Sequence, residues 1–484
     1  MEITKKTIGL FLGPIAFLLL FFFFGPEGLS KEGIAVLAVT SWVAIWWITE
    51  AAQVEVTALL PIVLFPLSGG LDLVETCAAY GHKFIFLFIG GFILAIAIEK
   101  WNLHRRIALS IIHVVGTNPK SIILGFMVST AFLSMWISNT ATTVMMLPIG
   151  VAIIKQMGGS DNKTQFGKAL MLAIAYAASI GGVATLIGTP PNIILAGVIQ
   201  QTYGVELTFT KWFMVGFPLS IVMLAICWQY ITRFAFSIED SQITGGKSYI
   251  KEQLRSLGKI GFEEKLVLVV FISTALLWIF RSAFLKEFIP ALDDTIIAIL
   301  AALVLFVLPS KQKGTSLLDW EDAVKLPWGI LMLFGGGIAI AVAFDGSGLA
   351  GWIATQLSSL DGIALFVLLL ILVASVNFLT EITSNLATAS VLLPVLAPLA
   401  LAMDVHPYAV MVACTIAASC AFMLPVATPP NAIVFGSGYL KISDMMRAGV
   451  WLNLISIVLI TLLVYFLLPL LWDIEINQFP EFLK

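Results

Sequence analysis

Long apolar runs alternate with short polar breaks from one end of the chain to the other. Eleven runs have roughly the length that a helix needs to cross a hydrocarbon layer, and they contain few charges. The pattern predicts an all-α polytopic membrane protein with about 11 transmembrane helices. The expected spans are 8–24, 33–50, 54–71, 84–99, 169–200, 212–232, 264–280, 293–309, 328–345, 406–437 and 448–472.

Two further apolar runs, 119–155 and 361–403, are too long for one crossing, and each has a polar triplet in its middle. The triplets are Ser138-Asn139-Thr140 and Ser384-Asn385-Leu386, and a proline follows each serine ten residues later. Irregular backbone at membrane depth is tolerated only where protein or a water-filled cavity surrounds it. We therefore expect two re-entrant helical hairpins with the triplets at their tips.

A second sequence motif is also repeated, inside apolar runs that would otherwise be single helices. Its copies are Thr189-Pro190-Pro191-Asn192 and Thr428-Pro429-Pro430-Asn431. Proline lacks a backbone donor and moves the preceding residue out of the helical region, so both helices should break there. Paired broken segments in two repeats are typical of a transporter with its substrate site between the repeats.

Composition supports a membrane protein and excludes several functions. The chain is 60% hydrophobic and 11% charged, with a mean hydropathy of +1.02, whereas a soluble domain has about 25% charged residues. No basic cluster suggests a nucleic-acid partner. No nucleophile–base pair and no HExxH-type ligand cluster lies in the apolar runs, so we do not expect an enzyme or a catalytic residue.

The distribution of basic residues predicts the topology. If the N-terminus is cytoplasmic and the eleven spans alternate, twenty of the 26 Lys and Arg residues lie on the cytoplasmic side and six outside. The protein is then a multi-pass plasma-membrane protein with an external C-terminus, and the hairpins enter from opposite sides, which makes the repeats inverted. The expected parts are an N-terminal transmembrane helix 1–32, a first inverted repeat 33–235, a cytoplasmic connector 236–262 and a second inverted repeat 263–484.

The polar triplets suit two roles. Ser, Asn and Thr are common helix N-caps, and a hairpin tip must start a new helix. A helix start also presents free N–H groups and the positive end of the helix dipole, which together can hold a carboxylate without an arginine. Two tips that face one cavity would hold two carboxylates, while carbonyls and hydroxyls at the broken helices suit a hard cation such as Na⁺.

Charge favours cation coupling. Residues 121–154 and 169–205 contain no acidic or basic side chain, and the second hairpin has Glu381 just before its triplet. Moving a dianion into a cell at −100 mV costs roughly 4–5 kcal/mol, which bound cations would offset. Glu381 is expected to be a structural or a proton-linked carboxylate, because a direct substrate role would repel an anion.

Four separated regions resemble the divalent anion/sodium symporter family, which contains bacterial sodium–dicarboxylate transporters of the INDY type. The matching regions cover nearly the whole chain and are 47–51 (Trp-Ile-Thr-Glu-Ala) with 56–61 (Val-Thr-Ala-Leu-Leu-Pro), 179–192, 380–385, and 419–434. The resemblance implies a homodimer in which each protomer has a scaffold and a mobile transport domain that moves as an elevator.

The resemblance also implies site residues. Substrate would be held by Asn139, Thr140, Ser384 and Asn385, with Thr189 and Thr428 alongside. One Na⁺ site would lie around Ser134, Ser138, Asn139 and Gly188, and its counterpart around Thr380, Thr383, Asn385 and Ala427. Two departures from the family pattern are visible: Leu386 stands where many relatives have Thr, which affects substrate preference, and Gln53 and Glu55 lie at an expected cytoplasmic turn where they should matter little.

The favoured hypothesis is Na⁺-coupled uptake of a C4 dicarboxylate such as succinate, malate or fumarate. A sodium-independent dicarboxylate exchanger is an alternative with the same fold. Symport of a related anion, sulfate or citrate, is another, because Leu386 changes the pocket. A channel is a further class, but opposed re-entrant tips favour alternating access.

Overall fold

The computed structural model describes residues 5–116, 118–156, 165–238, 246–311, 315–357 and 363–483. These ranges are helical with no β-strand, apart from one isolated bridge between Pro309 and Ser316. Eight helical stretches in them are long and apolar enough to cross a membrane, which agrees with the expected all-α membrane protein: Lys5–Phe23, Lys31–Thr49, Leu73–Lys100, Gln165–Val183, Phe209–Ala235, Trp328–Gly346, Asn385–Ala402 and Ile442–Trp472. Five shorter apolar helical stretches accompany them: Val54–Ser68, Pro119–Ser134, Asp294–Val307, Leu365–Thr380 and Pro407–Ala418.

The expected span 54–71 is wrong as a single helix. The chain forms α3 (Val54–Thr57) and α4 (Leu60–Ser68) there instead. Pro61 stands in the first turn of α4, where its missing N–H costs nothing, and Gly69 ends the helix with φ +76°. The nine residues of α4 reach only about 13 Å, less than half of a hydrocarbon layer.

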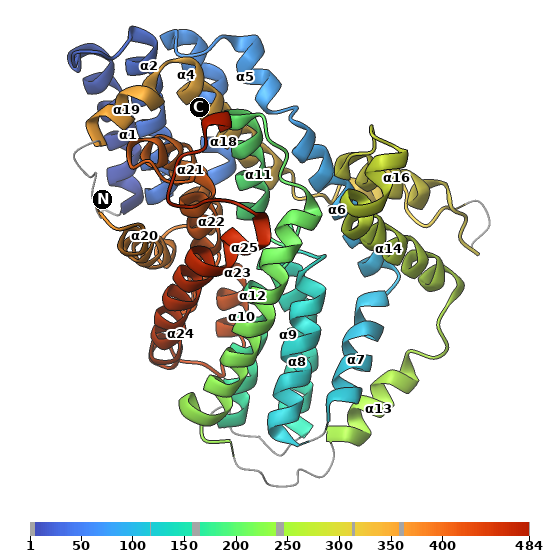
Figure 1. Ribbon diagram of the computed structural model, residues 1–484. Coiled ribbons are helices and arrows are strands. Elements are labelled where there is room, and N and C mark those ends of the chain that lie inside the picture. The colour runs from blue at the N-terminus through green and yellow to red at the C-terminus, as the bar shows by residue number, and fades with distance from the viewer. Residues whose placement is uncertain are drawn as a thin grey trace.

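Both expected hairpins are present as helix pairs with a non-helical tip (Figure 1). The first consists of α8 (Pro119–Ser134) and α9 (Asn139–Gln156), which pack side by side. The second consists of α20 (Leu365–Thr380) and α21 (Asn385–Ala402), and residues 361 and 362 of its expected range lie outside the described residues. The polar triplets lie where the second helix of each pair begins, as their capping preference predicts.

Both expected helix breaks are also present. One separates α10 (Gln165–Val183) from α11 (Pro190–Tyr203), and the other separates α22 (Pro407–Ala418) from α23 (Pro429–Gly436). The residues before the prolines have matching extended backbones, with φ −143° and ψ 142° at Thr189 and φ −141° and ψ 149° at Thr428. The prolines therefore impose the same local geometry twice.

The remaining helices surround these units. Near the N-terminus are α1 (Lys5–Phe23), which packs on α2 (Lys31–Thr49), and α5 (Leu73–Ala79). The others are α6 (Lys83–Lys100), α7 (Leu103–Val115), α12 (Phe209–Tyr230) with the π-turn η1 (Ile231–Ala235), α13 (Gly246–Ser256), α14 (Phe262–Phe280) with η2 (Arg281–Leu285), α15 (Lys286–Phe288), α16 (Asp294–Val307), α17 (Trp320–Ala323), α18 (Trp328–Gly346), α19 (Leu349–Leu357), α24 (Ile442–Leu462) with η4 (Leu463–Leu467), α25 (Leu468–Trp472) and η5 (Glu481–Leu483).

Helix α10 is the centre of the packing. Its residues from Ala169 to Val183 are all buried, and it packs against α8, α9, α12 and, from the second hairpin unit, α23. Tyr176 is fully buried and donates a hydrogen bond to the carbonyl oxygen of Phe422 at 2.8 Å. Gly181 allows the close contact with α8, because a Cβ there would lie 2.3 Å from the carbonyl oxygen of Ala131. Each hairpin together with its adjoining broken helix is called a hairpin unit below, and the two hairpin units share one core.

Candidate functional site

A cavity of about 490 Å³ lies between the two hairpin tips and the two helix breaks. Four helices begin at its wall: α9, α11, α21 and α23. Nine of the twelve residues that the sequence nominated for substrate or sodium lie on this wall: Ser138, Asn139, Thr140, Gly188, Thr189, Ser384, Asn385, Ala427 and Thr428. The structure thus brings residues from four distant segments around one space.

Three nominated residues do not line the cavity. Ser134 and Thr380 lie fully buried in the last turns of α8 and α20, and Thr383 is 4% exposed at the second tip. The Thr383 hydroxyl lies 2.9 Å from the Leu379 carbonyl oxygen and 2.7 Å from the Thr388 hydroxyl. The side chain of Thr383 is therefore engaged within its own hairpin and does not reach the cavity wall.

Ser134 forms a cluster of neutral oxygens behind the first tip. Its hydroxyl oxygen lies 2.5 Å from Asn139 Oδ1 and 2.8 Å from the Ala178 carbonyl oxygen. A hydroxyl has one proton, so it donates to only one of these two acceptors at a time. A Cβ at Gly182 would lie 2.5 Å from Asn139 Oδ1, so glycine is needed for this close approach.

The second tip repeats the cluster. Thr380 Oγ1 lies 2.7 Å from Asn385 Oδ1 and 2.9 Å from the Ala418 carbonyl oxygen. Both clusters combine a hydroxyl, an amide oxygen and a backbone carbonyl, which are the neutral oxygen donors that suit a hard monovalent cation. The chemistry of both donor sets therefore fits Na⁺.

Two asparagines that the sequence analysis left without a role support the helix breaks. Asn192 donates through Nδ2 to the carbonyl oxygens of Gly182, at 3.2 Å, and Thr185, at 2.8 Å. Asn431 does the same at 3.3 Å to Ala421 and 3.0 Å to Leu424. Both side chains are fully buried. Their repetition after each Pro-Pro pair was the signal that could have identified them.

Glu381 braces the second break. It is 3% exposed and accepts hydrogen bonds from the backbone N–H groups of Phe422, Met423 and Leu424 at 2.7 to 2.9 Å. The amide of Asn453, on α24, donates to it at 2.8 Å. These four N–H groups satisfy the carboxylate oxygens, and no ion pair to Glu381 is found among the described residues. This geometry favours the structural alternative for Glu381, which does not line the cavity.

Two acidic residues line the cavity that the sequence analysis did not nominate. Glu50 and Glu55, on either side of the turn between α2 and α3, belong to its wall. They also line another cavity of about 610 Å³, together with Lys6 and Gln53, so the two cavities are neighbours. Glu55 therefore lines both cavities, and Gln53 lines only the neighbouring one.

The cavity has a polar side and an apolar side. Hairpin tips and helix starts supply hydroxyl and amide groups, while Phe88 and Phe92 of α6 and Ile330 of α18 line other parts of its wall. No lysine or arginine among the described residues belongs to this wall. A bound anion would therefore be held by helix N-termini, neutral side-chain donors and any cation bound behind the tips.

Comparisons with known proteins agree along the whole chain. Residues 4–472 match the family described as the sodium:sulfate symporter transmembrane region. The sodium-dependent dicarboxylate transporter SdcS of Staphylococcus saprophyticus is 49% identical over 484 residues, covering 98% of this chain and 93% of that protein. The protein of the same name from Staphylococcus aureus strain bovine RF122 is 50% identical with the same coverage. Among solved structures, MtrF of Neisseria gonorrhoeae, described with a class of antimetabolite efflux pumps, superposes with a TM-score of 0.58 at 15% identity and 96% coverage of both chains, a likeness of fold alone.

Proposed function

The chain belongs to the sodium:sulfate symporter family, and from this premise we propose that it is a secondary transporter that couples uptake of C4 dicarboxylates to Na⁺. The substrates we propose are succinate, malate and fumarate. The observation that supports this most directly is the single cavity lined by both hairpin tips and both helix breaks, with neutral oxygen clusters behind the tips. The relatives that are about half identical are named sodium-dependent dicarboxylate transporters.

Substrate carboxylates would lie at the starts of α9 and α21. Asn139 and Thr140 would donate to one carboxylate, and Ser384 and Asn385 to the other, with Thr189 and Thr428 alongside. One Na⁺ would be held by Ser134 and Asn139 near Ser138 and Gly188. The second would be held by Thr380 and Asn385 near Ala427, and Thr383 would support it from within the hairpin. Since each asparagine belongs to both sets, cation binding would fix the orientation of the substrate-binding amide.

An elevator motion is our proposal for alternating access. Polar groups of the site come from the hairpins and broken helices, which share a core through α10, while an apolar wall comes from α6 and α18. A body that carries the polar groups can slide along an apolar surface without breaking hydrogen bonds. We propose 33–235 and 263–484 as the inverted repeats, joined by the connector 236–262, and a homodimer in the plasma membrane.

With the N-terminus cytoplasmic, the path past Glu50 and Glu55 leads to the cytoplasm and the C-terminus lies outside. The cavity would then represent an inward-open site. A dianion needs at least three Na⁺ for net inward positive charge, so we also propose that transport is electrogenic whenever a third Na⁺ accompanies the two cluster sites.

Uptake of labelled succinate into proteoliposomes tests the proposal. An inward Na⁺ gradient is compared with choline, with and without succinate inside. Uptake that requires Na⁺ but no internal succinate supports the symporter. Uptake that requires internal succinate and ignores Na⁺ would establish the exchanger instead. Absence of succinate uptake, together with Na⁺-dependent uptake of labelled sulfate or citrate, would assign a different anion.

A further inference from the structure

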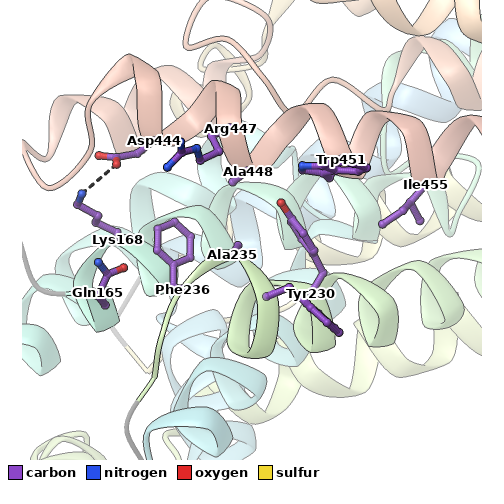
Figure 2. Close-up of a pocket in the computed structure, with 11 residues that line it drawn as sticks. Gln165, Lys168, Tyr230, Ala235, Phe236, Asp444, Arg447, Ala448, Trp451 and Ile455 are labelled. Atoms are coloured by element: carbon purple, nitrogen blue, oxygen red, sulfur yellow. Dashed lines mark hydrogen bonds and ion pairs between the residues drawn. The ribbon is translucent and has the colours of Figure 1, made fainter.

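A second cavity, of about 600 Å³, lies between α10, the end of α12 with η1, and α24 (Figure 2). It shares no lining residue with the cavity at the hairpin tips. Its polar wall contains Lys168 of α10, and Asp444 and Arg447 of α24. The transport proposal uses none of these residues, so the chemistry of this cavity needs its own explanation.

The charged end of the cavity suits an anion. Lys168 Nζ lies 2.9 Å from Asp444 Oδ1, so this cation is partly neutralised within the wall. Arg447 is exposed, and within the described part of the chain no ion pair or hydrogen bond of its side chain is found. Two cations and one carboxylate leave a net positive wall, with a guanidinium free to donate hydrogen bonds to two oxygens of a phosphate.

The apolar end continues along α24. Trp451 and Ile455 follow Arg447 at one-turn intervals on the cavity side, and Trp451 is 57% exposed. Leu454 and Val458 extend the exposed apolar surface along the same helix, at 42% and 51%. Trp451 and Tyr230 are amphipathic rings of the kind that gather at the boundary between headgroups and hydrocarbon.

We propose that this cavity binds an anionic phospholipid. Its phosphate would lie between Arg447 and Lys168, and one acyl chain would lie along Trp451 and Ile455. Basic pockets between transmembrane helices are recognised sites for anionic headgroups. A phospholipid fits better than free phosphate because the cations stand at one end of a continuous apolar strip, which a small anion would leave exposed to the bilayer.

Native mass spectrometry of the full-length purified protein in detergent tests the site. Phosphatidylglycerol is titrated against phosphatidylcholine, and glycerol 3-phosphate is added as a headgroup without acyl chains. Arg447→Gln should weaken retention of phosphatidylglycerol by about tenfold, the loss of one charge-assisted contact. Arg105→Gln is the matched control, because Arg105 is an exposed arginine on α7 outside this cavity. It should leave retention unchanged.

A second variant tests the acyl-chain part. Trp451→Ser should weaken phosphatidylglycerol binding severalfold and leave the weaker binding of glycerol 3-phosphate itself unchanged. Equal retention by Arg447→Gln and the unchanged protein would overturn the proposal. Displacement of the lipid by glycerol 3-phosphate at matched concentrations would also overturn it and make the cavity a site for a free phosphate. Both changed residues are exposed, and unaltered size-exclusion profiles would show that the variants fold.

Discussion

In the first hairpin unit Asn139 lies beside the hydroxyl of Ser134, and Asn192 holds the adjoining helix break; in the second, Asn385 lies beside Thr380, and Asn431 holds the break. The corresponding distances agree within a few tenths of an ångström. The supports differ. Three residues before the serine, the first tip has Met135, whose carbonyl accepts a hydrogen bond from the Thr185 hydroxyl. The second has Glu381, whose carboxylate accepts four.

The comparison separates what is duplicated from what is not. The oxygen clusters at the tips occur twice, and so do the asparagines at the helix breaks, Asn192 and Asn431. This repetition indicates that each tip has the same task. The means of holding each broken segment is individual, with a neutral hydroxyl in one unit and a buried charge in the other. A polar side chain can thus lie close to the site and still serve only to support the fold. Matched substitutions in the two hairpin units can test which role a given side chain has.

The largest effect is expected at the duplicated asparagines. Asn139→Ala and Asn385→Ala should each lower Na⁺-dependent uptake by about 100-fold or more, because each would remove a proposed substrate donor and a proposed cation ligand together. Initial uptake rates in proteoliposomes measure this. Asn477→Ala, at an exposed position near the C-terminus, is the control. If one asparagine variant keeps normal uptake, the two tips do not share a task.

Glu381→Gln should destabilise the protein far more than Met135→Leu. The glutamine amide loses the ionic character of four hydrogen bonds and points a donor at other donors, so we expect a loss of about 2–4 kcal/mol. A volume-conserving change at Met135 should cost below about 1.5 kcal/mol. Thermal unfolding followed by size-exclusion fluorescence compares them. Normal stability of Glu381→Gln together with an altered pH dependence of uptake would instead support a proton-linked role.

Leu386→Thr should make the two tips more alike. Leu386 lines the cavity where the first tip has Thr140, so the added hydroxyl can donate to the substrate. One neutral hydrogen bond contributes about 1 kcal/mol, so the KM for succinate should fall about fivefold. Thr140→Leu is the converse variant and should raise the KM. If Leu386→Thr leaves the KM for succinate unchanged but alters inhibition of uptake by sulfate, the second tip determines which anion is selected.

The smallest effect is expected at the acidic path. Glu55 lines both the site cavity and its neighbour, where a carboxylate would repel the proposed dianion. Glu55→Gln should lower the KM from that face by about twofold to fivefold, with a weaker effect at high salt. Counterflow in vesicles of each orientation measures this, with Glu475→Gln as an exposed control. An equal effect from both faces would place Glu55 in the site rather than in the path.

Local signals predicted the hairpins and helix breaks well. The residues before Pro190 and Pro429 have only one favourable backbone geometry, and the polar triplets can end an apolar run only at a tip. These constraints act over a few residues, so the sequence contains them. The division of 54–71 into α3 and α4 also depends on a proline. Hydrophobicity alone does not reveal it, because a proline inside an apolar run does not interrupt the hydrophobic pattern.

Contacts between distant segments could not be predicted in the same way. The four donors to Glu381 come from 41 to 72 residues away, so its role depends on how α20 meets the break and α24. Glu55 was expected at a cytoplasmic turn and Glu50 at the end of a span, and neither position indicates that both residues line the cavity together with Ser384 of the second tip.

The hydrogen bond from Tyr176 to Phe422 joins residues 246 positions apart, and it has a consequence for how the protein is made. At about 5–20 residues per second, the ribosome needs roughly 10–50 s to deliver Phe422 after Tyr176. During that time the first hairpin is already in the membrane, while α23, which packs on α10, does not yet exist. The early half must therefore wait in the bilayer, incompletely packed, until the late half completes its core.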